Sequence, residues 1–92
     1  MQSDEQVETP EIRVKRLRMR SWRRGMKEMD LILGPFSDTE LVGLPPETLD
    51  QYEDLLDEND QDLYKWVSGA APVPDAHAPM IAIISNFHGI SH

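Results

Sequence analysis

The sequence predicts an all-α fold: a single domain in which four to five short helices form a compact bundle. Apolar residues recur at spacings of three and four along most of the chain, which is the period of an amphipathic helix. The chain lacks the hairpin turn signals and the sustained apolar–polar alternation that are typical of strands. Its 92 residues, 39% of them hydrophobic, are enough for one modest core.

The first helix is predicted to run from Pro10 to about Arg24. Thr9 supplies a hydroxyl for the N-cap, Pro10 suits the first helical position, and Glu11 places an acid in the first turn. Gly25 follows, and a glycine inside a helix costs about 1 kcal/mol relative to alanine. We therefore expect either a helix break or a close approach of another group at Gly25.

A second helical piece is predicted over residues 26–33, where apolar residues keep the same helical spacing. The pair Gly34 and Pro35 should interrupt or kink it, because proline removes a backbone donor. Residues 37–40 are then expected to cap a separate short turn of helix before Gly43.

Three further helices are predicted in the second half of the chain. Pro46 marks the start of one, Asn59 or Asp60 caps the next and Gly69 ends it. Residues 80–87 form a last short helix, for which a strand is the alternative. The residues expected to share one core are Trp22, Met26, Met29, Leu33, Leu49, Tyr52, Leu56, Leu63 and Trp66.

These elements divide the chain into four parts: a disordered acidic N-terminus (1–9), a helical bundle (10–69), a proline-rich linker (70–79) and a short C-terminal helix with its tail (80–92). No apolar run approaches the length that crosses a bilayer, so no membrane insertion is expected. Residues 1–11 resemble neither a secretory signal nor an Arg-rich presequence. We therefore expect a cytoplasmic, bacterial protein.

Charge is distributed unevenly along the chain. The formal net charge is −8, yet residues 12–27 carry eight of the nine lysines and arginines and no acid. Three explanations stay open: the acidic helices fold back and neutralise this basic segment, the segment binds nucleic acid, or it binds an acidic protein partner. Because Trp22 is the only aromatic ring nearby and the rest of the chain is acidic, we predict no binding to nucleic acid.

No catalytic or metal-binding motif stands out. The acidic run at residues 57–62 lacks the glycine and glutamate that an EF-hand loop requires, so it is interpreted as a solvated turn. Ser85 has a histidine three residues on but nothing to orient it as a base. The histidines, His77, His88 and His92, have no spacing typical of a metal site, and the chain has no cysteine. We predict neither an enzyme nor a metal protein.

A short motif in the basic segment points to protein recognition. Arg24 and Glu28 are one turn apart and would offer a forked donor and an acceptor on either side of Gly25, which lets a partner backbone come near. The alternative is that Arg24 and Glu28 only pair with each other along one helix.

Two blocks of sequence resemble the succinate dehydrogenase assembly factor 2 family. The first is Arg24-Gly25-x-x-Glu28 within the segment 22–36, which matches the defining Arg-Gly-x-x-Glu motif of that family. The second comprises Leu55-Leu56 and the stretch 60–69, which resembles the family's Leu-Leu and Asp-x-Asp-Leu-aromatic-x-Trp pattern. The resemblance spans about residues 12–69, and the tail from residue 70 departs from it.

The resemblance implies a five-helix bundle that promotes covalent attachment of FAD to the flavoprotein subunit of succinate dehydrogenase and, in some bacteria, of fumarate reductase. It implies a monomer that binds this subunit without stably binding FAD, which belongs to the partner. The alternative function is a small helical adaptor or antitoxin-like regulator whose basic helix binds an acidic partner or nucleic acid. The implied partner-binding residues are Arg24, Gly25 and Glu28, followed by Arg23, Met26, Lys27 and Asp30.

Overall fold

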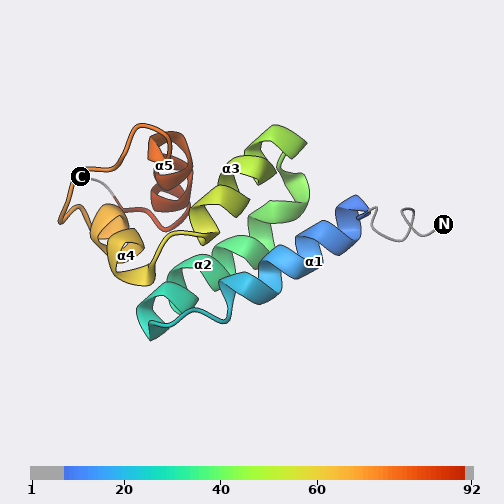
Figure 1. Cartoon of the computed structure of the whole chain (residues 1–92), viewed down its shortest axis with the longest axis horizontal. Coiled ribbons are helices and arrows are strands. Elements are labelled where there is room, and N and C mark those ends of the chain that lie inside the picture. Colours follow the sequence, from blue (N-terminus) through green and yellow to red (C-terminus); the bar gives the residue numbers. More distant parts are fainter. Residues whose placement is uncertain (1–7, 91–92) are drawn as a thin grey trace.

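The computed structural model describes residues 8–90, which contain five α-helices and one short 3-10 helix. They are α1 (Pro10–Ser21), α2 (Lys27–Glu40), η2 (Leu41–Gly43), α3 (Pro46–Leu56), α4 (Asp60–Ser68) and α5 (Ala78–Phe87). Helices α1 and α2 form an antiparallel pair, α3 lies alongside α1 and runs in the same direction, and α4 and α5 pack together at the end away from the N-terminus (Figure 1). No strand occurs among the described residues, so the all-α prediction is confirmed.

Helix α1 starts as predicted and ends earlier than predicted. Thr9 caps it by accepting the backbone N–H of Ile12 at 3.1 Å. The helix stops at Ser21 instead of Arg24: the N–H groups of Trp22 and Arg23 still bind carbonyls of its last turns, but those of Arg24 and Gly25 bind carboxylates and do not continue the helical ladder. The N–H of Arg24 donates to Asp30 at 2.7 Å. The N-terminal segment predicted to be disordered spans residues 1–9, and its residues 1–7 lie outside the described residues.

Helix α2 passes through Pro35, and the predicted interruption there is wrong. Residues 37–40, expected to cap a separate short turn before Gly43, are the last part of α2, and the turn before Gly43 is η2. Tertiary packing holds the helix together across the proline: the indole of Trp22 covers Gly34 so closely that a Cβ on Gly34 would lie 2.4 Å from the ring. Ser37 reinforces this point by donating its hydroxyl to the Gly34 carbonyl at 2.7 Å.

Trp22 does not belong to the core, contrary to the prediction. Its side chain lies on the outside of the α1–α2 pair and is 41% exposed. The indole N–H donates to the carboxylate of Asp38 at 3.2 Å, and Arg18 binds the same carboxylate at 3.0 Å. An amphipathic ring with one polar group is well suited to this half-exposed position.

The remaining helices follow the predicted boundaries closely. Pro46 opens α3, and Asn59 caps α4 by accepting the N–H of Asp62 at 2.9 Å. Gly69 ends α4 in the left-handed conformation, with φ of 82°, which favours glycine. The last segment is a helix and not a strand, and it starts at Ala78 instead of residue 80.

The core is continuous through all five helices. Every residue predicted for it is buried except Trp22 and the half-buried Met26, which still packs against the cluster. The prediction missed Leu17 and Phe36 and the whole contribution of α5, which buries Met80, Ile81 and Ile84. Among the described residues no helix is long and apolar enough to cross a membrane.

Ion pairs join the basic helix α1 to the acidic helix α3, as the first explanation of the charge pattern predicts. Arg13 binds Asp50 at 2.6 Å, Arg16 binds Glu53 at 2.9 Å, and Arg20 reaches the turn after α3. The Arg16 guanidinium holds the pKa of Glu53 below its usual range. A buried hydrogen bond of 2.6 Å between the hydroxyls of Ser21 and Tyr52 also links the two helices.

Gly34→Ala tests the packing of Trp22. Helix propensity alone would make alanine the more stable residue by about 1 kcal/mol. We expect the opposite result, a loss of about 1–3 kcal/mol in the free energy of unfolding, because the indole has to move. Urea unfolding of the wild type and of Gly34→Ala measures this change in the free energy of unfolding. The same substitution in a Trp22→Ala background should no longer destabilise, and an equal loss in both backgrounds would contradict the packing argument.

The pKa of Glu53 makes stability depend on pH. Its folded-state pKa is lowered, so its stabilisation is present above the unfolded-state pKa and is lost as pH falls through the folded-state value. We expect Glu53→Gln to remove about 0.5–1 kcal/mol at pH ~6 and less at pH ~3. Asp54→Asn, on the same helix and without an ion pair among residues 8–90, is the control. A loss for Glu53→Gln that is the same at both pH values would contradict the assignment.

Candidate functional site

The side chain of Arg24 faces inward from the loop of residues 22–26, with only 9% of it exposed. Its Nε donates to Asp60 at 2.7 Å, and its two terminal nitrogens donate to the carbonyls of Leu56 and Glu58, each at 3.0 Å. These carbonyls lie where α3 ends, a position that leaves acceptors unpaired and favours a cation. The guanidinium therefore links the α1–α2 loop to the α3–α4 turn by hydrogen bonds.

Asp60 binds this loop at two points. One carboxylate oxygen accepts from the Arg24 guanidinium and the other accepts the backbone N–H of Gly25. We call these two bonds the Asp60 clamp. Asp60 is free for this role because Asn59 caps α4. With 14% of the Asp60 side chain exposed, separating the pair would leave a partly buried charge uncompensated, which resists opening of the loop.

The clamp explains the glycine at position 25. Gly25 does not have a positive φ, so the backbone conformation does not require glycine there. Space favours it: an added Cβ would lie 3.0 Å from the Asp60 carboxylate, which would have to shift by a few tenths of an ångström. The close approach expected at this position is therefore made by the chain's own Asp60.

The loop leaves a second part of the motif open to solvent. Glu28 is exposed in the first turn of α2 and forms no ion pair within residues 8–90. The alternative in which Arg24 and Glu28 pair along one helix is wrong, because Arg24 precedes α2 and binds Asp60. Beside Gly25 lies a recess of about 270 Å³, lined by Gly25, Met26, Asn59, Asp60 and Gln61.

The other predicted site residues divide in the same way. Arg23 and Lys27 are exposed on either side of the loop, whereas Met26 is half-buried against the core. Asp30 is half-buried and accepts the N–H of Arg24 at 2.7 Å. The structure thus brings the predicted residues together around one loop, with Arg24, Met26 and Asp30 turned inward and Arg23, Lys27 and Glu28 turned outward.

Sequence reasoning missed Asp60 as a member of this site. The available signal was a pair of adjacent capping residues, Asn59 and Asp60, of which only one can cap α4, so that the other side chain is left without a capping role. Two of the histidines lie elsewhere: His77 contacts Glu58 at 3.0 Å, and His88 contacts the Ile32 carbonyl at 2.6 Å, while His92 lies outside the described residues. No group of three potential metal ligands gathers within residues 8–90.

Comparison with known proteins assigns the family. A family described as flavinator of succinate dehydrogenase matches residues 15–88, which include the loop and the Asp60 clamp. A protein of Debaryomyces hansenii is 44% identical over 69 residues, covering 70% of this chain and 49% of that protein. One of Schizosaccharomyces pombe is 37% identical over 68 residues, covering 74% and 49%, and one of Mycosarcoma maydis is 39% identical over 67 residues, covering 73% and 28%.

These three fungal relatives are each named succinate dehydrogenase assembly factor 2, mitochondrial. The prediction of a bacterial cytoplasmic protein is therefore wrong. The chain spans about half the length or less of these relatives. Since the family match covers most of the chain and the whole candidate site, the chain belongs to the family of flavinators of succinate dehydrogenase.

Proposed function

We propose that this chain is an assembly factor that binds the flavoprotein subunit of succinate dehydrogenase and promotes covalent attachment of FAD to it. The observation that carries the proposal is the family match over residues 15–88. The relatives in this family are named assembly factors, which supports a binding role and not a catalytic one. The attachment itself belongs to the partner's own chemistry, so no residue of this chain is assigned a catalytic step.

The geometry supports recognition by a fixed surface. The Asp60 clamp holds Gly25 in place, and α2 carries Glu28 outward from the same loop. A loop that is already ordered loses less conformational entropy when it binds than a flexible one would. In this proposal Glu28 and the backbone at Gly25 contact the partner, together with Arg23 and Lys27, and Arg24 acts as a positioning residue.

The same proposal covers the cofactor and the assembly state. FAD belongs to the flavoprotein. This chain binds the flavoprotein as a monomer and does not itself hold FAD stably. By stabilising one arrangement of the partner's domains, the chain raises the population in which flavin and acceptor side chain are correctly oriented. Fumarate reductase, where the host has it, is a second candidate for the same assistance.

Deletion of the gene in its host tests the function. The flavoprotein subunit is separated on a denaturing gel and examined for flavin fluorescence, because only covalently bound flavin survives denaturation. We expect a strong loss of signal in the deletion strain at unchanged subunit level, and recovery with the wild-type gene. An unchanged signal would contradict the proposal and favour an adaptor with another partner.

Glu28→Ala tests the proposed contact in the same assay. We expect a loss of covalent flavin with a melting temperature close to that of the wild type, because Glu28 has no ion-pair partner among residues 8–90. Glu47→Ala is the matched control, since Glu47 is an exposed glutamate that likewise follows the first residue of its helix. Both substitutions remove a negative charge from a helix N-terminus, where it stabilises the helix by about 0.3–1 kcal/mol. Equal flavinylation by the two variants would exclude Glu28 as a contact.

A further inference from the structure

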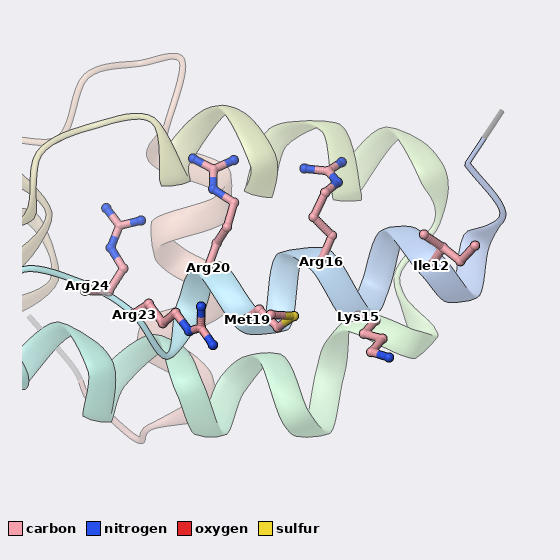
Figure 2. Close-up of a pocket in the computed structure, with 7 residues that line it drawn as sticks. All are labelled: Ile12, Lys15, Arg16, Met19, Arg20, Arg23 and Arg24. Atoms are coloured by element: carbon pink, nitrogen blue, oxygen red, sulfur yellow. The ribbon is translucent and has the colours of Figure 1, made fainter. Parts of the chain in front are cut away.

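A groove runs along the outer face of α1, on the side away from the core (Figure 2). It encloses about 490 Å³. Two apolar side chains lie between its edges: Ile12, 55% exposed, and Met19, 46% exposed. They are seven positions apart, which is about 10.5 Å along a helix. The other lining residues are all cations, Lys15, Arg16, Arg20, Arg23 and Arg24.

The composition of this groove is unusual for the chain that carries it. The protein has 17 acids against nine lysines and arginines, yet no acid within residues 8–90 lines the groove, whereas five of the nine cations do. Opposite charges from α3 and the following turn reach only one edge. Figure 2 shows Arg16 and Arg20 extending toward α3, where they bind Glu53 and Asp57.

The cations of the other edge have no such compensation. Lys15 and Arg23 are exposed and form no ion pair within residues 8–90. Lys15 points away from α3 in Figure 2. Two exposed apolar side chains beside unpaired cations form a surface that is complementary to an acidic amphipathic segment.

We propose that this groove docks an acidic amphipathic segment of the flavoprotein subunit, with two apolar side chains over Ile12 and Met19 and acidic side chains beside Lys15 and Arg23. The inference rests on the proposed function and extends the proposed loop contact, which already includes Arg23, along α1 to Met19, Lys15 and Ile12. Nucleic acid fits the groove less well, because no aromatic ring lines it and the rest of the chain is acidic.

Charge reversal tests the docking. Lys15→Glu and Arg23→Glu each change the net charge by two units, and so does the control Lys65→Glu at an exposed lysine on α4. Binding of the full chain to the purified flavoprotein subunit is measured by titration at ~0.15 M salt. We expect each groove variant to bind about tenfold more weakly and the Lys65 variant to change by less than about twofold. Equal affinity of all three variants would overturn the inference.

Cross-linking identifies the occupant directly. The chain has no cysteine, so Met19→Cys provides a single thiol for a photo-reactive cross-linker, with Lys65→Cys as the control. We expect Met19→Cys, but not the control, to capture an acidic peptide of the flavoprotein. The inference would be overturned if Met19→Cys captured a neutral or basic peptide or a second copy of this chain. It would also be overturned if the chain bound labelled nucleic acid and Lys15→Glu abolished that binding.

The two proposals fail in distinguishable ways. If the wild-type chain does not bind the flavoprotein subunit, the proposed function fails and this inference fails with it. If the wild type binds and supports covalent flavin but the groove variants bind equally well, only the inference about the groove fails.

Discussion

The carboxylate of Asp60 fixes the geometry of the α1–α2 loop, and the candidate site depends on it. One oxygen binds the Arg24 guanidinium and the other binds the Gly25 N–H, so a single side chain at the start of α4 holds a loop 35 residues earlier in the sequence. Arg24 in turn satisfies two carbonyls at the end of α3. Three helix ends meet at this point, and the exposed position of Glu28 follows from how they are joined.

The same electrostatic logic organises α1. Its arginines on the α3 side are neutralised within the chain, which stabilises the packing of α1 against an acidic helix. Lys15, on another side of α1, and Arg23, in the loop that follows, stay unpaired within residues 8–90 and lie next to Ile12 and Met19. One basic segment thus contributes both to the stability of the bundle and to a positively charged surface on a protein that is otherwise acidic. The two roles are separated by the side of the helix that each residue occupies.

Local sequence signals predicted the helices well where caps and breakers act locally, as at Thr9, Asn59 and Gly69. These local signals failed where tertiary contacts determine whether a helix continues or where a side chain points. Pro35 was expected to interrupt α2, and the helix survives because Trp22 packs over Gly34, a contact between residues 12 apart. The motif around Gly25 could be found from spacing, but the inward direction of Arg24 could not, because it depends on Asp60 and on the carbonyls at the end of α3. No local pattern carries that information.

Hydrogen exchange at the Gly25 amide tests the clamp most directly. Gly25 is exposed, so its amide would exchange quickly if the Asp60 carboxylate did not hold it. The structure predicts slow exchange of this amide in the wild type and fast exchange in Asp60→Ala, with the amides in the middle of α1 and α2 unchanged. Asp62→Ala, on the same turn of α4, should leave the Gly25 amide protected. Fast exchange of the Gly25 amide in the wild type, equal to that in Asp60→Ala, would contradict the account.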